Sequence, residues 1–521
     1  MTEETRSDPA AELDPASTSL SRLALVAILL VGACLRLAHL GGPSLYYDEV
    51  VTMELARAPN PVRLLRLMDR IDASRAPLQP LLLQAWVKVF GPSDLAGRLF
   101  SAVCGILTLV VVHEIGRRVF DRSTGLWAAW LAALSPALVR YSQEVRMYAW
   151  LVLLTCLSWA VFFSFRHSAP LWKRSAYTLC LAALVYTHPL ALFMVAAHAL
   201  AYVASRPALR LTWRDWLATQ VVAVLLMAPW LPQYLRNRPS YIVGRQPIRL
   251  LLGLPIEYIG GNSLALLGCA ALIAWGLRSR DGLRLDRPRE SLAVLIWFLV
   301  PPVLLYGLSL VSHPVFGLAR YTLFVAPAYL LLVARGISKL PMPPRYLTAL
   351  VGMVLSAMLL RTMVYDNPDP KADWRSAAAL IARTDPRATV VPLSPIPENS
   401  YVDVDTARYY LGPEIKILAT STLLGAGGTR ALGDSVWVAA RVRDGRLLQP
   451  LPAVFEREYR PRGRWDFPGL RLFWFTRLLT LTDFRFEIPD SRMTENLVLS
   501  NVLESGMSGI WNRIRTGSAG M

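Results

Sequence analysis

Long apolar stretches alternate with short polar connections over residues 22–364. A membrane-spanning helix needs about 20 mostly apolar residues. Stretches near that length predict spanning helices at residues 22–40, 98–116, 124–139, 146–165, 174–187, 189–205, 216–235, 261–277, 290–311, 320–338 and 346–364. The apolar segment 78–90 is shorter and contains Pro80, Gln84 and Lys88, so it is expected to be an interfacial or re-entrant helix instead of a full span. The pattern predicts an α-helical polytopic membrane domain with about 11 transmembrane helices.

The distribution of charge orients this domain. The chain has 55 Lys and Arg against 37 Asp and Glu, a net charge of +18, and 54% of its residues are hydrophobic. Basic residues cluster in alternate connections, such as Arg117, Arg118 and Arg122, which the positive-inside rule assigns to the cytoplasm. The lipid bilayer, not nucleic acid, is therefore the predicted counterpart of the charge. Residues 1–21 are predicted to be a disordered cytoplasmic N-terminus of a protein of the inner (plasma) membrane.

The composition changes after Leu360. Residues 365–521 contain Pro- and Asp-rich turns, short apolar runs at 389–393 and 435–439, and a helical stretch at 373–382. This pattern predicts a small soluble α/β domain. The odd number of predicted spans places that domain on the extracytoplasmic side, together with an outer loop over residues 41–97.

Two adjacent carboxylates follow the first predicted span, in the sequence Tyr46-Tyr47-Asp48-Glu49. At a membrane surface such a pair can supply a general base or help to hold a divalent cation. The alternative is the start of a helix, where acidic side chains interact favourably with the helix dipole.

Further short motifs follow in order: Arg75-Ala76-Pro77-Leu78, the run Tyr-Ser-Gln-Glu-Val-Arg-Met-Tyr at 141–148, Thr187-His188, Arg320-Tyr321 and Asp373-Trp374-Arg375. With the Asp-Glu pair, they resemble the GT-C glycosyltransferases of family 39, which include protein O-mannosyltransferases and lipid A aminoarabinose transferases. The resemblance covers roughly residues 20–375. Ala76 departs from it, because the family has proline there.

The resemblance implies a reaction. Members of this family move a sugar from a polyprenyl-phosphate carrier to an acceptor on the extracytoplasmic face. By resemblance, Asp48 is the general base for the acceptor hydroxyl, and Glu49 orients it or shares a cation. Arg75 becomes a clamp for the donor phosphate, although an interfacial arginine reaching the lipid headgroups is the alternative. A displacement with one base behind the anomeric carbon inverts that carbon.

The remaining candidates are charged or aromatic residues on the predicted outer face, where ionisable side chains tend to be functional. They are assigned to the substrate or the donor phosphate: Arg140, Glu144, Arg146, His188, Arg245, Arg320 and Tyr321. Because Arg140 and Glu144 lie four residues apart, a salt bridge on one helix turn is an alternative. A divalent metal ion held by Glu49 and His188 is left open, as is a structural role for His188.

The sequence has no Walker A loop, no dinucleotide-binding glycine motif and no Gly-x-Ser-x-Gly motif. The lipid-linked sugar is therefore expected to supply the energy itself. Two other functions stay open: a transporter or flippase of lipid-linked sugars, and a non-catalytic scaffold of an envelope polysaccharide system. A transporter predicts polar residues along mid-membrane helices, whereas the ionisable residues here gather at one face. The pattern does not define the sugar or the acceptor, whether protein, lipid or glycan.

Overall fold

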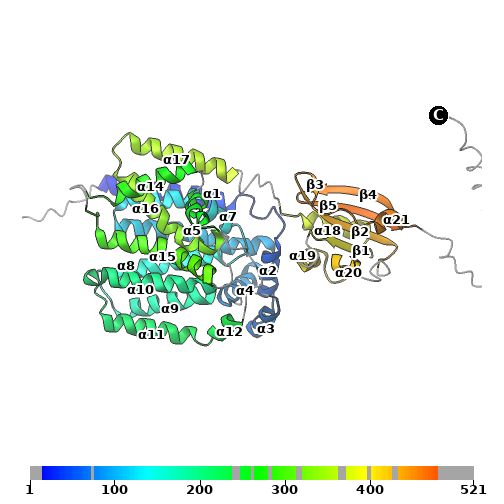
Figure 1. Ribbon diagram of the computed structural model, residues 1–521, viewed down its shortest axis with the longest axis horizontal. Helices are drawn as coiled ribbons and strands as arrows, with labels where there is room; N and C mark the ends of the chain where they lie inside the picture. The colour runs from blue at the N-terminus through cyan, green and yellow to red at the C-terminus, as the bar shows by residue number, and fades with distance from the viewer. Residues whose placement is uncertain are drawn as a thin grey trace, which may run out of the picture.

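The computed structural model describes residues 15–71, 76–236, 247–259, 263–279, 284–311, 319–361, 371–395, 400–424 and 432–478. These residues form a helical bundle followed by a smaller α/β domain at one end of it (Figure 1). Arg75 and Arg245, two of the predicted donor-binding residues, lie outside the described residues.

The bundle is built from helices that cover part of every predicted span. They are α1 (Pro15–Leu37), α5 (Asp94–Val119), α6 (Arg122–Leu134), α7 (Pro136–Ser142), α8 (Tyr148–Ser164), α9 (Leu171–Thr187), α10 (Leu192–Ser205), α11 (Trp213–Met227), α12 (Leu231–Arg236), α13 (Arg249–Ile259), α14 (Ser263–Leu277), α15 (Pro288–Val311), α16 (Ala326–Lys339) and α17 (Pro344–Leu360), with 3-10 turns η1 (Pro189–Ala191), η2 (Arg206–Ala208) and η3 (Ala319–Val325).

Five of the described helical segments are long and apolar enough to cross a bilayer by length and composition. They are Ser19–Leu37, Asp94–Val119, Pro189–Ala208, Pro288–Val311 and Arg320–Lys339. The chain is therefore a multi-pass membrane protein. The total of eleven spans stays a prediction.

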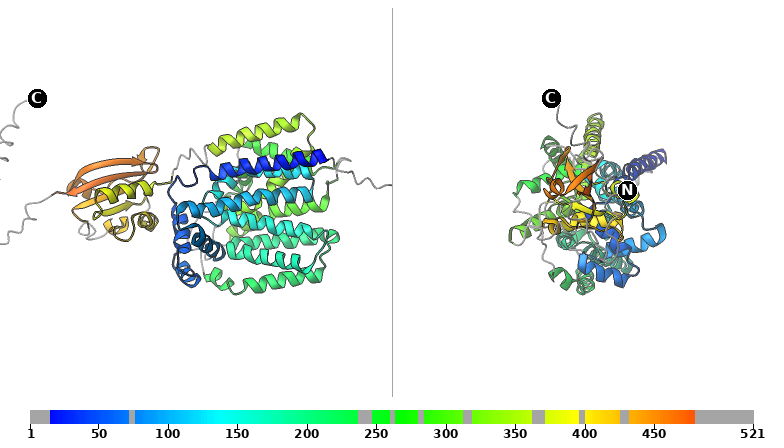
Figure 2. Two further views of the ribbon diagram at one scale, coloured as in Figure 1. Left: turned by 180° about the vertical axis from the view of Figure 1, so that it is seen from behind. Right: turned by 90° about the vertical axis from the view of Figure 1, so that its right-hand side faces the viewer.

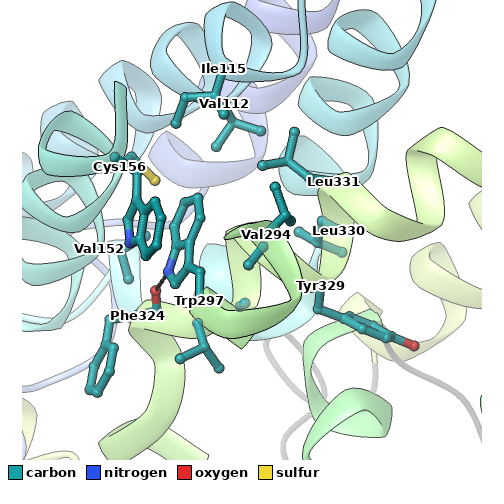
Figure 3. Close-up of a cluster of buried hydrophobic side chains, with 14 of the residues drawn as sticks. Val112, Ile115, Val152, Cys156, Val294, Trp297, Phe324, Tyr329, Leu330 and Leu331 are labelled. Carbon is teal, nitrogen blue, oxygen red and sulfur yellow. Dashed lines mark hydrogen bonds between the residues drawn. The ribbon is translucent and has the colours of Figure 1, made fainter. Parts of the chain in front are cut away.

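Aromatic and small residues pack the centre of the bundle. The indoles of Trp159 in α8 and Trp297 in α15 are stacked, with their ring centroids 5.1 Å apart. The indole N–H of Trp297 donates to the carbonyl of Phe324 over 3.1 Å (Figure 3). A Cβ on Gly116 would lie 2.7 Å from the Cα of Gly125, so α5 and α6 touch backbone to backbone. Small residues permit this close approach, which favours helix association in a bilayer.

Three short helices gather at the end of the bundle that faces the α/β domain: α2 (Tyr47–Ala56), α3 (Pro61–Ile71) and α4 (Leu78–Phe90) (Figures 1 and 2). The helix α4 occupies the segment for which an interfacial or re-entrant helix was predicted. Its Leu83 and Val87 belong to the same buried cluster as Val50 and Met53 of α2. These contacts fix the helix that carries Asp48 and Glu49.

The α/β domain contains a sheet of five described strands: β1 (Thr389–Leu393), β2 (Ser435–Arg443), β3 (Arg446–Leu447), β4 (Tyr459–Phe467) and β5 (Leu470–Arg477). The strand order is β1-β2-β5-β4, with β3 paired to β2, and only the β1–β2 pairing is parallel among these strands. Its helices are α18 (Trp374–Thr384), α19 (Ser400–Leu411), α20 (Thr420–Leu424) and α21 (Val454–Arg457). Trp374, Ile381 and Trp437 are buried between α18 and the sheet. An extracytoplasmic position of this domain stays a prediction.

Candidate active site

The carboxylate pair lies in the first turn of α2. The backbone N–H of Tyr46 donates to Oε2 of Glu49 over 2.9 Å, which closes the start of the helix. Acidic side chains in a first helical turn are favoured by the helix dipole and by the free N–H groups there. The two readings of the motif, a helix start and a functional pair, are therefore compatible. Asp48 and Glu49 then point into very different surroundings.

The carboxylate of Glu49 is completely buried. Its Oε1 accepts from Nε of Arg98 over 3.1 Å and from the backbone N–H of Val145 over 3.0 Å. Its Oε2 accepts from Nη2 of Arg98 over 3.3 Å and from Nζ of Lys371 over 2.5 Å. Burial alone would raise the pKa of Glu49, but the two cations outweigh it and lower that pKa to about 2. A charge satisfied in this way holds structure in place and does not face a substrate.

Arg98 connects Glu49 to the preceding loop. It is buried, and its guanidinium donates to the carbonyls of Leu40, Pro43 and Ser44 over 3.0, 2.7 and 3.0 Å. A planar group with five donors suits such a task. The Glu49–Arg98 pair therefore fixes the 40–49 segment, and with it the position of Asp48.

Asp48 is partly exposed, and two arginines converge on it. Its Oδ2 lies 3.4 Å from Nη1 of Arg320, with side-chain exposures of 22% and 28%. Its carbonyl accepts from Nη1 of Arg146 over 3.0 Å, and the same nitrogen donates to Oγ1 of Thr52 over 3.0 Å. Arg320 belongs to η3 and Arg146 to the connection before α8. The structure thus brings together three predicted site residues from three separate segments.

Aromatic rings form a wall beside these arginines. The guanidinium of Arg320 lies 6.0 Å from the ring centroid of Tyr148 and 5.4 Å from that of Tyr321. The imidazole of His188 lies 6.4 Å and 6.1 Å from the same two rings. Tyr148, the last residue of the 141–148 motif, is buried here. Cations over aromatic faces are favourable when shielded from water.

His188 is neutral in this environment. Burial, with the nearby charges of Arg146 and Arg320, lowers its pKa to about 3. Its Nδ1 accepts from the backbone N–H of Leu190 over 3.2 Å, at the start of η1. In a neutral imidazole the proton is then on Nε2. His188 therefore offers a donor and no positive charge.

The residues present do not fit the metal site left open by the sequence. Both oxygens of Glu49 already face cationic nitrogens, and Nδ1 of His188 accepts a backbone hydrogen bond. Within the described residues, no group of three His, Cys, Asp or Glu side chains is arranged to hold an ion. The hypothesis that Glu49 and His188 share a divalent cation is therefore abandoned.

Other predicted residues are placed differently. Arg140 and Glu144 pair with each other over 3.6 Å, and Arg140 is about half exposed, as the salt-bridge alternative predicted. Sequence reasoning missed Arg98 and Lys371. An arginine that opens an apolar span is a signal for Arg98, because a charge in that position needs a partner. Lys371 has no comparable signal.

Comparison with known proteins gives one matching family model, for dolichyl-phosphate-mannose-protein mannosyltransferase, over residues 74–233. This region includes α4 through α11 but not the Asp48 turn. A comparison with curated protein sequences gives no match.

Similar solved structures define the class of fold: the chain has the GT-C glycosyltransferase fold, as the resemblance predicted. ArnT from Cupriavidus metallidurans in the apo state is 15% identical, with a TM-score of 0.56 over 88% of this chain and 98% of that chain. ArnT bound to undecaprenyl phosphate is also 15% identical, with a TM-score of 0.53 over 89% of this chain and 98% of that chain. The third structure is the archaeal oligosaccharyltransferase AglB from Archaeoglobus fulgidus, in complex with an inhibitory peptide and a dolichol-phosphate. It is 12% identical, with a TM-score of 0.51 over 91% of this chain and 76% of that chain.

Proposed function

We propose that this protein transfers a sugar from a polyprenyl-phosphate-linked donor to an acceptor hydroxyl, with inversion at the anomeric carbon. The observation that carries the proposal is the contact between the partly exposed carboxylate of Asp48 and the guanidinium of Arg320. A candidate base and a candidate phosphate-binding cation then belong to one site, and a sugar bound there can present opposite faces of its anomeric carbon to the two groups, as an inverting displacement requires. Two similar folds were solved with undecaprenyl phosphate and dolichol-phosphate, which supports this class of donor.

Each residue has a role in that reaction. Asp48 accepts the proton of the acceptor hydroxyl while the hydroxyl oxygen bonds to the anomeric carbon. The bond between that carbon and the phosphate oxygen breaks, and the polyprenyl phosphate leaves with the electron pair. Arg320 and Arg146 offset the charge that develops on the phosphate, and Nε2–H of His188 is a further donor for an oxygen of the substrate. Arg75 joins them as a phosphate clamp in this proposal.

The proposed reaction takes place on the extracytoplasmic face of the plasma membrane. The distribution of arginines supports this side, because the connections at the other ends of the helices hold the basic clusters predicted to be cytoplasmic. A lipid-phosphate donor carries its own activated bond, so the site needs no nucleotide.

The test uses purified protein, a radiolabelled polyprenyl-phosphate sugar and the Asp48→Asn variant. Loss of a general base is expected to lower kcat by about 10²- to 10⁴-fold. Binding of the polyprenyl phosphate should persist, because the arginines are unchanged. Asp69→Asn, an exposed carboxylate of the nearby helix α3, is the matched control and should transfer sugar as the native protein does. Full transfer by Asp48→Asn would exclude Asp48 as the base.

A further inference from the structure

The α/β domain contacts the loop that carries Asp48. Nζ of Lys371, just before α18, is 2.5 Å from Oε2 of the buried Glu49. Two residues later, Oδ1 of Asp373 accepts from the hydroxyl of Ser44 over 2.8 Å. The backbone N–H of Arg375 donates to the same hydroxyl oxygen over 3.1 Å. The first residues of the domain thus hydrogen-bond to both ends of the 44–49 segment.

A second set of contacts joins this loop to the start of α5. Nη1 of Arg375 donates to the carbonyls of Gly41 and Gly42 over 2.9 and 3.0 Å, and its Nη2 pairs with Asp94 over 2.7 Å. The hydroxyl of Tyr410 in α19 donates to Asp94 over 2.8 Å and accepts from the backbone N–H of Leu45 over 2.6 Å.

These contacts order a segment that begins with two consecutive glycines, Gly41 and Gly42. Glycine has more backbone freedom than any other residue type, so ordering this segment costs more conformational entropy. Lys371 also supplies a second positive charge to Glu49, whose burial without cations would be unfavourable. A catalytic group has to be held within about 0.5 Å of its productive position, so a shift of this loop would move Asp48 out of place.

We propose that Lys371 and Tyr410 are positioning residues. Through them the α/β domain packs against residues 41–49 and holds Asp48 in its catalytic position. This inference rests on the proposed function. It gives the domain a role in the chemical step itself. Neither residue touches the reacting atoms, so both act through Glu49 and Leu45.

The experiment measures transfer kinetics and local protection together, in the full-length protein. In Lys371→Met, kcat is expected to fall by about 10- to 100-fold, the loss typical of a small misplacement of a reacting group. The donor KM should change little, and amide hydrogen exchange over residues 41–56 should be faster. Lys371→Arg keeps the charge and should restore most of kcat. Tyr410→Phe, which removes both hydroxyl contacts, should resemble Lys371→Met.

Arg464→Gln is the matched control. Arg464 is an exposed arginine of β4 that pairs with Asp466, and its loss should change neither kinetics nor exchange. Native kcat and native exchange in Lys371→Met would overturn the inference while Asp48→Asn still tests the function. If Asp48→Asn transfers sugar normally, Asp48 is not the base, and if the native protein transfers no sugar, the proposed function fails. In either case the exchange measurement alone then decides whether the domain holds the loop. If Lys371→Met does not fold, Tyr410→Phe and Lys371→Arg decide the inference by the same two measurements.

Discussion

Asp48 and Arg320 are separated by 272 positions in the sequence, yet a carboxylate oxygen of one lies 3.4 Å from a guanidinium nitrogen of the other. The first belongs to the opening turn of α2 and the second to η3, which leads into α16. The distance is long for a charged pair, for which 2.7–2.9 Å is typical. In the proposed reaction, the donor phosphate competes with Asp48 for the guanidinium of Arg320, which leaves the carboxylate available as the base.

Arg320 is expected to set the affinity for the donor. In Arg320→Gln, the donor KM should rise by about 10- to 100-fold, the range expected when a hydrogen bond to a charged group is lost. Arg320→Lys should recover only part of the lost donor affinity, because an ammonium cannot bind phosphate in the forked geometry of a guanidinium. Steady-state kinetics with a polyprenyl-phosphate sugar measures both variants.

Arg140→Gln serves as the comparison, because Arg140 is about half exposed and pairs with Glu144. Its effect on the donor KM should be smaller than that of Arg320→Gln. The reverse order would place the donor phosphate beside Arg140 and contradict the arrangement proposed for Arg320.

Glu49 is expected to be required for stability. Glu49→Gln leaves the buried Arg98 without its counter-charge, and breaking such a pair typically costs about 3–5 kcal/mol. Thermal unfolding in detergent should show a clear decrease in Tm. Glu114→Gln removes a carboxylate of a solvent-exposed pair with Arg117, for which about 0–1 kcal/mol is expected.

The loss of stability in Glu49→Gln is expected to depend on pH. The pKa of Glu49 is lowered from its ordinary value of 4.5 to about 2 in the folded protein. Its stabilising effect is therefore complete above the ordinary value and is lost as the pH falls toward the lowered one. The difference in Tm between the native protein and Glu49→Gln should narrow over that acidic interval. A difference that stays constant would show that the charge of Glu49 is not what stabilises the fold.

The sequence was sufficient for the GT-C fold and for naming Asp48 as a candidate, because spans and the residues that follow them are local features. It was insufficient for the role of Glu49. Its partners Arg98, Val145 and Lys371 lie 49, 96 and 322 positions away, and only tertiary packing brings them together. The sequence also could not separate Arg140 from Arg146, since both flank the same turn and differ only in which neighbour each one meets.

His188 is expected to act without titrating. Its pKa is lowered from an ordinary value of 6.5 to about 3, so its imidazole stays neutral across the interval in which a histidine ordinarily titrates. The His188→Gln variant should have a lower kcat/KM. Its pH–rate profile between about pH 5 and 8, the usual interval for histidine, should be parallel to that of the native protein. If the pH–rate profile of the native protein changed slope near the ordinary histidine pKa and that of the variant did not, His188 would titrate during the reaction and this assignment would be contradicted.

Close packing of α16 against α14 is expected to hold Arg320 in position. A Cβ on Gly336 would collide with the backbone of Leu272, and one on Gly276 would lie 2.6 Å from the backbone nitrogen of Gly336. Gly336→Ala therefore forces the two helices apart, at a cost of about 1–3 kcal/mol for an overpacked contact. The Tm should fall. The donor KM should also rise, because α16 directly follows the turn that carries Arg320.

Gly352→Ala in α17 is the control for that variant, because no heavy atom lies within 4 Å of the Cβ it would add. Alanine is about 1 kcal/mol better than glycine inside a helix, so this variant should be as stable as the native protein or slightly more so. An unchanged Tm in Gly336→Ala would show that α14 and α16 are not in backbone contact. A lower Tm with a native donor KM would separate the packing of α16 from the position of Arg320.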